Sequence, residues 1–590
     1  MAYTVSHFIV DRLHAWGVRR VFGYPGDGIN GVIGALAEAT DRIDFVEPRH
    51  EEMAAFMASG HAKVTGEIGV CLSTAGPGAV HLLNGLYDAK ADHQPVLAVV
   101  GQQARSALGS QYQQEIDLAA LFKDVASPYV QMITTATQAR HVVDRAVRIA
   151  LAERCPTCII VPSDVQELEF EDPPRKHLTA HSGIGFSRPR VGPTAQTLAD
   201  AARVLNAGER VAILVGAGAA GARSQVLQVA DVLGAGIAKA LLGKHVIPDD
   251  IAHVTGTIGF LGTRPTYDMM VGCDTLLMIG SGFPYGEFLP PEGKARGVQI
   301  DIDGRMLGLR YPMEVNIQGD AAQTLELLLP LLERKGDRAR PWREKIEAGV
   351  RKWWDTMAER AALEAKPVNP QRVFSELSPR LPGDAMIATD TGTTVFWYAR
   401  HVRMQPDHLG LHSGGLASMG AAMPYALAAK FAYPSRPAFA LVGDGAMQMS
   451  GMNELITLAR YWKRWSDPRF VILVLNNRDL TFVSWEQRIM KGDPKFPGSQ
   501  DVPDVSYAGF ANLLGIRGIV VSRPEEIAPA WDEAIGAKQP VLIEAMVDPD
   551  VPMLPPHITV EQAGNYLKAI LRGDPDAAAI LKASIKEILA

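Results

Sequence analysis

A carboxylate flanked by two glycines ends an apolar run, and this feature limits what the chain can form. Residues 439–442 (FALV) are followed by Gly-Asp-Gly at 443–445 and then by an amphipathic stretch. A second apolar run, residues 470–475, leads directly into two asparagines at 476–477. Both runs predict buried strands, and an open α/β sheet places its ligands where its strands end. We therefore expect these oxygen-bearing side chains to form one binding site.

Apolar and helical stretches alternate along the whole chain, which has 590 residues. Runs rich in Val, Ile and Leu are strand-like, and their alternation with helices is typical of parallel α/β sheets. Polar, proline-bearing breaks at residues 170–193 and from 335 to about 370 divide the chain. We predict an α/β protein of three doubly wound parallel-sheet domains and a C-terminal tail, with boundaries at residues 1–180, 190–335, 365–550 and 551–590.

Composition limits the class of partner. The net charge is -7 and no basic arm offsets it, so we expect no nucleic-acid partner. The N-terminal segment carries charges throughout and no apolar stretch is long enough to cross a bilayer. We expect a cytoplasmic protein, attached at most to the inner face of a membrane.

Cys155 and Cys158 have redox or zinc spacing, but no second pair completes a zinc site, and we interpret Cys158 as part of a buried strand.

The glycine-flanked carboxylate is suited to a metal-bound diphosphate. Mg²⁺ takes oxygen ligands in octahedral geometry, several of them from phosphate. Asp444 can supply one ligand, Asn477 a second and the backbone carbonyl of Asp479 a third. The helix after Gly445 would direct its amides at the phosphates, and the glycines let the backbone come close. The alternative for either piece alone is a plain Asx turn beside a solvated asparagine pair.

Together the two pieces resemble the cofactor motif of thiamine diphosphate enzymes, GDG followed about thirty residues later by NN. The interval is slightly longer than in the family, and we interpret YWKRWSDPR, residues 461–469, as an insertion in a surface loop. The resemblance implies thiamine diphosphate and Mg²⁺. It assigns Asp444 and Asn477 as side-chain ligands and Asp479 as a carbonyl ligand, with Gly445 and Ala446 beside the diphosphate.

The segment RHEEMAAFMASGHAK resembles the one that carries the family's cofactor-activating acid, which aligns with Glu51. An acid is needed there because thiamine's own aminopyrimidine serves as the base that activates its C2 carbon. Burial raises a carboxyl pKa and keeps the required proton available. Without the resemblance, Glu51 or Glu52 would be interpreted as a surface helix acid.

The segment HSGGLASMGAAMPYALAAK resembles the one that holds the cofactor in its bent shape. The resemblance places Met419 between the two cofactor rings, a role suited to an unbranched, polarizable side chain. It places the backbone of Ala417, with Ser418, at the aminopyrimidine, and Gly392 and Thr393 of TDTGTTVFW near the diphosphate. Taken alone, Met419 would be interpreted as a core residue.

A dinucleotide-type motif lies in the middle block. The strand-like RVAILV is followed by G-x-G-x-x-G at residues 216–221, but no acid follows at the usual distance to take a ribose hydroxyl. The block resembles the flavin-containing members of the same family, which implies FAD, although some relatives keep this domain without using flavin for redox chemistry. The residues that the resemblance assigns to FAD are Gly216, Ala217, Gly218, Gly259, Phe260, Leu261, Gly262, Gly280, Ser281, Asp301, Ile302, Asp303, Asp320 and Ala321.

The residues just past Asn477, RDLTFVSWEQR, indicate which member the chain resembles, because they approach the reactive carbon of thiamine. Acetolactate synthases carry a tryptophan where this chain has Glu486. Pyruvate oxidases have Phe, an aliphatic residue and then Glu, which matches Phe482, Val483 and Glu486. The segment around His81 is also similar to pyruvate oxidases, and LPPHITVEQAGNYLKAIL resembles the ending of the bacterial quinone-linked pyruvate dehydrogenase.

The resemblance implies an oxidoreductase that decarboxylates pyruvate or a similar 2-oxo acid through thiamine diphosphate and passes electrons to FAD and then to oxygen or a quinone. Glu51 would activate the cofactor. The side chains that would position substrate or move protons are His81, Gln114 and Glu486. Two departures make the pocket more polar and leave another 2-oxo acid open: Gln113 where the family has Phe, and Thr391 where Val is common.

Two other functions stay open. One is an acetolactate synthase-type carboligase in which FAD has no redox role. The other is a catalytically silent binding subunit, against which the intact Glu51, Asp444 and Asn477 argue. In the family the cofactor bridges two chains, so the resemblance implies a homodimer or a homotetramer.

The C-terminal tail ends in an amphipathic helical pattern. Its apolar residues fall on one helical face, and they are Ile580, Leu581, Ile585, Ile588 and Leu589. This face either docks on the protein's own surface or makes a peripheral contact with a membrane.

Overall fold

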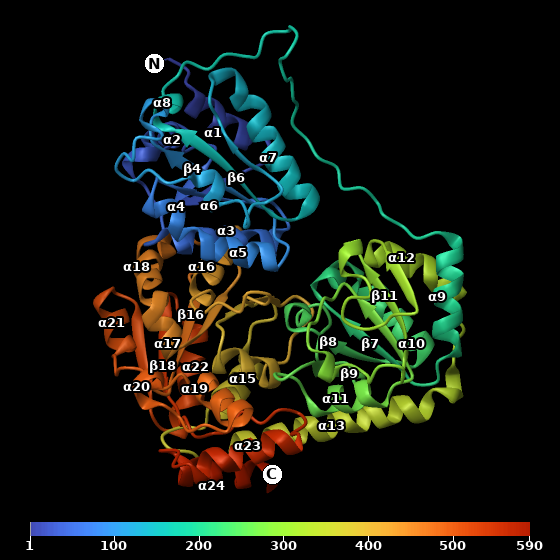
Figure 1. Cartoon of the computed structure of the whole chain (residues 1–590). Coiled ribbons are helices and arrows are strands. Elements are labelled where there is room, and N and C mark those ends of the chain that lie inside the picture. Colours follow the sequence, from blue (N-terminus) through green and yellow to red (C-terminus); the bar gives the residue numbers. More distant parts are fainter. Residues whose placement is uncertain (1, 590) are drawn as a thin grey trace.

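Three parallel sheets form the framework of the protein in a computed structural model that describes residues 2–589 (Figure 1). Each sheet has six strands, and neighbouring strands within the sheets run parallel. The predicted α/β class with three parallel-sheet domains is therefore confirmed. In the described part of the chain, none of the helices combines the length and the apolar character needed to cross a bilayer.

The first sheet has the order β2-β1-β3-β4-β6-β5. Its central strands are buried along their whole length, as expected where helices cover both faces of a parallel sheet. The strands are β1 (Arg20–Gly23), β2 (Asp44–Val46), β3 (Gly69–Ser73), β4 (Val96–Gln102), β5 (Val130–Met132) and β6 (Pro156–Pro162). The helices are α1 (Val5–Ala15), α2 (Asn30–Glu38), α3 (Glu51–Thr65), α4 (Pro77–His81), α5 (Leu83–Ala91), α6 (Leu118–Leu121), α7 (Ala139–Glu153) and α8 (Ser163–Gln166).

The second sheet has the order β12-β11-β10-β7-β8-β9, with its topological switch between β10 and β7. The strands are β7 (Val211–Val215), β8 (Gly236–Lys239), β9 (Val254–Thr257), β10 (Thr275–Ile279), β11 (Arg296–Asp301) and β12 (Val315–Gln318). The helices are α9 (Ala195–Ala207), α10 (Arg223–Leu233), α11 (Arg264–Gly272) and α12 (Ala321–Leu328). Between α8 and α9, residues 170–194 form no helix or strand and cross from the first domain to the second (Figure 1).

The third sheet has the order β14-β13-β15-β16-β18-β17, which repeats the connectivity of the first. Its switch lies between β13 and β15, beside the strand that leads to Asp444. The strands are β13 (Met386–Thr389), β14 (Leu409–Leu411), β15 (Ala438–Gly443), β16 (Phe470–Asn476), β17 (Arg517–Val521) and β18 (Val541–Met546). The helices are α14 (Pro370–Leu377), α15 (Thr393–His401), α16 (Ala422–Ala432), α17 (Asp444–Ala446), α18 (Met452–Tyr461), α19 (Thr481–Glu486), α20 (Pro497–Gln500), α21 (Tyr507–Leu513) and α22 (Ile527–Gly536).

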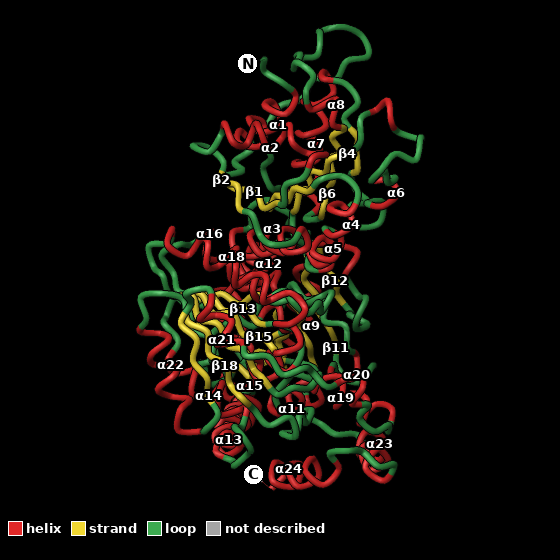
Figure 2. Tube along the Cα trace, turned by 90° about the vertical axis from the view of Figure 1, so that its left-hand side faces the viewer, coloured by secondary structure: helices red, strands yellow, loops and turns green. Residues whose placement is uncertain are grey.

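The first and third domains pack directly on each other, as both ribbon views show (Figures 1 and 2). Helix α3 of the first domain lies against α16 of the third, and Phe56 and Tyr425 belong to one hydrophobic cluster that continues through both domains. The backbones approach so closely that a Cβ on Gly60 would lie 2.9 Å from the ring of Tyr425. A glycine is therefore needed at this crossing.

The long helix α13 (Arg340–Ala362) connects the second domain to the third, and it runs beneath the second domain in Figure 1. Its N-terminal part is fixed to the second domain, since the Trp342 indole donates a hydrogen bond to the Val211 carbonyl at 3.0 Å. Its C-terminal part reaches the tail, where Arg360 pairs with Glu587 at 3.2 Å.

The tail forms two helices, α23 (Val560–Leu571) and α24 (Ala577–Leu589), packed beneath the third domain (Figure 1). Of the five apolar residues predicted on one face of α24, only Ile580 is buried; the exposed fractions of the other four run from 39% for Leu581 to 82% for Leu589. Glu587 is 3% exposed and accepts a hydrogen bond from Gln371. Helix α24 therefore docks through a mixed polar and apolar face and leaves most of its apolar residues outward.

Candidate active site

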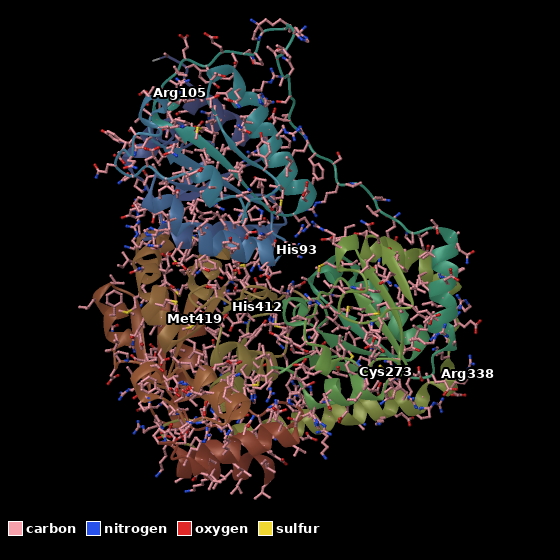
Figure 3. All side chains as sticks on the ribbon, in the orientation of Figure 1. His93, Arg105, Cys273, Arg338, His412 and Met419 are labelled. Atoms are coloured by element: carbon pink, nitrogen blue, oxygen red, sulfur yellow. The ribbon has the colours of Figure 1, made fainter. Side chains whose placement is uncertain are left out.

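A large cavity of about 2000 Å³ lies at the junction of the three domains, walled mainly by the second and third. Figure 3 shows His412 on the third domain where it meets the second, and His93 of the first domain above the same junction; both line the cavity. The predicted site residues in its wall are Gly216, Ala217, Gly218, Gly259, Phe260, Leu261, Gly280, Ser281, Asp301, Ile302, Asp303, Asp320, Ala321, Gly392, Thr393, Ala417, Met419, Asp444, Gly445, Ala446, Asp479, Phe482, Val483 and Glu486. Gly262, Ser418 and Asn477 lie beside these residues in the chain but not in the wall.

Asp444 and Asn477 come together because β15 and β16 are neighbouring parallel strands that end at one edge. The Asp444 carboxylate accepts backbone hydrogen bonds from Gly445 at 2.8 Å and Asn477 at 3.0 Å. Burial raises the pKa of Asp444 to about 6, and no lysine or arginine in the described chain pairs with it. A buried carboxylate without a cationic partner fits a divalent cation, because the ion would supply the missing positive charge.

The turn after β16 is an Asx-type turn, as the alternative interpretation required. The side-chain oxygen of Asn477 accepts from the Asp479 amide at 3.0 Å, and its amide group donates to Thr481 at 2.8 Å. The Asp479 carboxylate is engaged by other residues. It accepts a hydrogen bond from Ser484 at 3.0 Å and pairs with Lys495 at 3.1 Å. The backbone carbonyl of Asp479 accepts from the Thr481 hydroxyl at 3.3 Å, and its assignment as a metal ligand stays a prediction.

The helix that follows Asp444 is irregular at its start. Short α17 continues into a π-helical turn, Met447–Gly451, and then into α18. Such π-helical turns occur often at functional sites. A Cβ on Gly445 would lie 2.6 Å from the end of the Leu480 side chain, so glycine lets this turn pack against Leu480, and the Met419 side chain lies in ordinary contact at 3.4 Å.

The loop that carries Met419 is held by an acid that the sequence interpretation missed. Asp390 follows β13 and accepts backbone hydrogen bonds from Gly420 at 2.8 Å and Ala422 at 3.2 Å; burial raises its pKa to about 7. Ala417 has a left-handed φ of 55°, a strained conformation typical of functional loops. The signal was present, because Asp390-Thr391-Gly392 repeats the pattern of an apolar strand ending in an acid.

Thr391, the neighbour of Asp390, also holds this loop. Its hydroxyl donates to the Ser418 carbonyl at 3.1 Å. Thr391 lines the cavity, and the expectation that it makes the pocket more polar stays a prediction. Gln113 lies outside the cavity wall within one chain.

Glu51, His81 and Gln114 gather at a separate place in the first domain. Glu51 begins α3, is 8% exposed, and lies 2.9 Å from Nδ1 of His81. Gln114 has a left-handed φ of 63° and packs against Gly76, where an added Cβ would lie 2.8 Å from its side chain. None of these three residues lines the cavity, so one chain alone does not bring them to the candidate metal site.

Two glycine-rich loops of the middle domain pack closely in the wall of the cavity. A Cβ on Gly216 would lie 2.2 Å from the Gly280 carbonyl, and one on Gly218 would lie 2.8 Å from Gly280 Cα, so these glycines let two loops pack closely. Asp301 ends β11, and burial raises its pKa, whereas Asp303 is engaged by Arg305 at 2.9 Å. Ligand pockets of drug-sized molecules measure about 300–1,000 Å³. A cavity of about 2000 Å³ therefore has room for a dinucleotide beside a second cofactor.

The two ends of the cavity meet at an aromatic contact. Phe482 of α19 meets Phe260 of the middle domain edge to face, with ring centroids 5.7 Å apart. Val483 is 47% exposed, and Glu486, at the end of α19, has its pKa raised by burial. Glu486 therefore holds its proton to a higher pH than an ordinary glutamate, which suits a group that donates or accepts a proton in the cavity.

Comparison with known proteins decides the family. Models of the thiamine pyrophosphate enzymes match the N-terminal binding domain at residues 3–121, the central domain at 198–328 and the C-terminal binding domain at 390–545. The chain belongs to the thiamine pyrophosphate enzyme family. The resemblance inferred from the GDG and NN motifs is thereby confirmed, and the matched C-terminal model contains both Asp444 and Asn477.

Three relatives of this thiamine pyrophosphate enzyme cover nearly its whole length. A putative thiamine pyrophosphate-containing protein, YdaP, of Bacillus subtilis is 36% identical over 96% of both chains. A pyruvate oxidase of Lactiplantibacillus plantarum is 30% identical over 92% of this chain and 89% of its own. A probable acetolactate synthase large subunit of Methanocaldococcus jannaschii is 31% identical over 93% of both. The family therefore contains both of the reaction types expected from sequence.

Proposed function

We propose that the protein oxidatively decarboxylates pyruvate or a similar 2-oxo acid with thiamine diphosphate, Mg²⁺ and FAD, and passes the electrons to oxygen or a quinone. The Phe260–Phe482 contact carries this proposal, because it joins the candidate thiamine end and the candidate flavin loop within one cavity. The pyruvate oxidase relative supports the same reaction. Bound thiamine diphosphate would supply the carbon nucleophile, and FAD would accept the two electrons.

The residues of this chain have distinct roles in the proposal. Asp444, Asn477 and the Asp479 carbonyl hold Mg²⁺ and, through it, the diphosphate. Glu51 holds a proton at the aminopyrimidine of the cofactor. Glu486, whose pKa burial raises, moves a proton at the substrate. Phe482 and Val483 line the part of the cavity in which the reacting carbon would lie.

We propose that two copies of the chain form each active site. Glu51, His81 and Gln114 are absent from the cavity wall of one chain, and a second copy would supply them. A mixing experiment tests this: inactive Glu51→Gln and Asp444→Ala proteins are co-refolded or co-expressed. A hybrid dimer has one site with both wild-type residues, so part of the activity returns. If each chain contains a complete site, the mixture stays inactive.

The second candidate is an acetolactate synthase-type carboligase, which the 31% identical synthase relative favours. Anaerobic mixing separates the two functions. Purified protein with FAD, thiamine diphosphate and Mg²⁺ is combined with pyruvate under nitrogen, and the flavin absorbance is followed. Bleaching within one turnover, colour recovery with oxygen or a quinone, and acetate or acetyl phosphate as product support the oxidase. An oxidised flavin together with accumulating acetolactate supports the carboligase. If neither occurs, a series of other 2-oxo acids is tested.

A further inference from the structure

Arg400 is a buried cation near the C-terminal end of α15. It is 3% exposed, and its guanidinium donates to the backbone carbonyls of two residues of the middle domain: Phe260 at 3.1 Å and Leu261 at 3.4 Å. Both carbonyls belong to a loop in the cavity wall. Arg400 thus ties the third domain to one loop of the second.

No carboxylate in residues 2–589 forms a salt bridge with Arg400. The charge of Glu587 acts to raise the pKa of Arg400, but the Glu587 carboxylate pairs with Arg360 instead, at 3.2 Å. Burial lowers the pKa of Arg400 to about 9, so the side chain stays charged near neutral pH. The ring of Phe396 lies 4.0 Å from the guanidinium and compensates part of the lost hydration. A desolvated cation is costly, so its carbonyl hydrogen bonds are strong constraints on the loop that accepts them.

The loop that Arg400 holds is at the junction of the two candidate cofactor sites. Phe260 contacts Phe482 at 5.7 Å and Phe396 of α15 at 5.8 Å between ring centroids. The other end of α15 begins at Thr393, which lines the cavity on the side of Asp444. One rigid helix therefore touches both candidate sites, and Arg400 is its contact with the flavin side.

We propose that Arg400 is a positioning residue that fixes the loop at residues 259–262 against Phe482 and so determines the position of the flavin-binding loop relative to the thiamine site. The inference rests on the proposed function, because it takes FAD as the ligand of this loop. It assigns no contact between Arg400 and the flavin or the substrate. Arg400 acts through the two carbonyls, which a lysine cannot engage as a planar fork.

The test compares Arg400→Gln, Arg400→Lys and a matched control, Arg403→Gln. Arg403 follows on the same segment, and its guanidinium also lies 4.0 Å from an aromatic ring, that of Trp354, but it is exposed and donates to neither carbonyl. For each holoprotein we would measure FAD affinity by titration of apoprotein, thiamine diphosphate affinity by circular dichroism, and the visible spectrum of the bound flavin. Thermal unfolding reports whether each variant is folded.

We expect Arg400→Gln to weaken FAD binding by at least about tenfold, which is about 1.4 kcal/mol, and to alter the flavin spectrum. Thiamine diphosphate affinity should change less than about twofold, and Arg400→Lys should fall between the glutamine variant and wild type. If the glutamine variant does not fold, the lysine variant against Arg403→Gln decides the question. Equal FAD affinity and identical spectra in folded variants of both positions would overturn the inference. Wild-type protein that binds FAD but is not reduced by any 2-oxo acid contradicts the proposed reaction alone, whereas no FAD binding by wild type overturns both.

Discussion

His81 Nδ1 lies 2.9 Å from Oε2 of Glu51, at the start of the buried helix α3. The His50 ring lies beside that of His81, tilted by 32° with ring centroids 4.3 Å apart, so two histidines adjoin the carboxylate. This contact leaves Glu51 with one oxygen outside the His81 hydrogen bond. That oxygen lies beside Gly78, where an added Cβ would be 3.1 Å away, so a ligand group can approach without a side chain in its path.

Glu51→Gln should keep thiamine diphosphate bound and lose about 10²–10⁴-fold in turnover, because an amide cannot hold and return the proton at the aminopyrimidine. Steady-state kcat and cofactor titration measure the two effects separately. Glu52→Gln is the matched control. Glu52 is the next residue of α3, and its carboxylate accepts a hydrogen bond from Asn84 at 2.5 Å rather than from His81. Wild-type turnover in the Glu51 variant would show that another acid activates the cofactor.

Asp444→Ala should weaken Mg²⁺-dependent binding of thiamine diphosphate by more than about tenfold, or about 1.4 kcal/mol. The physical reason is the loss of a buried carboxylate that no cation of the described chain balances. Excess Mg²⁺ and cofactor should restore part of the binding. Asp504→Ala, which removes only a surface pair with Arg478, should bind normally. Unchanged cofactor affinity in Asp444→Ala would reject the metal assignment.

The sequence predicted that Asp444 and Asn477 lie at one edge of the sheet because the geometry is local to two strand ends, whereas their role as metal ligands stays a prediction. Asp444 and Asn477 each follow an apolar run, and neighbouring parallel strands bring their ends together. Asp390 has the same signal and was missed, since its bonds to Gly420 and Ala422 depend on a loop whose path the sequence does not specify. Arg400 carries no local signal at all, because its partners lie 139 and 140 positions earlier in the chain.

The tail shows the same limit. Apolar periodicity left two roles open for one face of α24, docking on the protein or contact with a membrane, but Gln371 and Arg360 bind Glu587, so the helix docks through a different face. The periodicity remains informative, since it identifies the residues that point outward. An exposed apolar stripe on a docked helix agrees with the expected peripheral membrane contact, which stays a prediction.

Substitution of Ile585 and Ile588 by Asp should abolish co-sedimentation with anionic phospholipid vesicles in the presence of substrate, while activity with a soluble acceptor remains. The two residues are 51% and 64% exposed, so charge there should disturb little of the packing. Leu513→Asp is the control, because Leu513 is 85% exposed on another surface. Wild-type protein that never sediments with the vesicles would reject the membrane contact.

Deletion of the tail is a poorer test of membrane contact than these substitutions. Asp574 pairs with Arg488 at 2.8 Å, and the Arg488 side chain is 1% exposed. Removing the residues after Gly573 would leave this cation buried without its partner, two positions after Glu486 in the chain. We therefore expect a truncated protein to lose activity for a structural reason, whatever the tail binds.

Glu587→Gln should remove a pH dependence from the docking of α24. Burial raises the pKa of Glu587 from its ordinary 4.5 to about 7, although Arg360 and Arg400 act in the opposite direction. Gln371, which donates to Glu587, also lies 3.2 Å from His401, and burial lowers the pKa of His401 to about 3, so this histidine stays neutral. The docked state therefore binds the Glu587 proton more tightly than the undocked state does.

A carboxyl whose pKa is raised in the folded state contributes stability that is fully present below the pKa of the unfolded state. This stability is lost as the pH rises through the pKa of the folded state. Docking of α24 should thus weaken between about pH 5 and about pH 7, by on the order of 3 kcal/mol at most. Limited proteolysis of the tail and thermal unfolding across this range measure the effect. The glutamine variant imitates the protonated acid, so its tail should stay protected at the higher pH, while Glu561→Gln on exposed α23 should behave as wild type. The same pH slope in Glu587→Gln and wild type would mean that another group controls the docking of the tail.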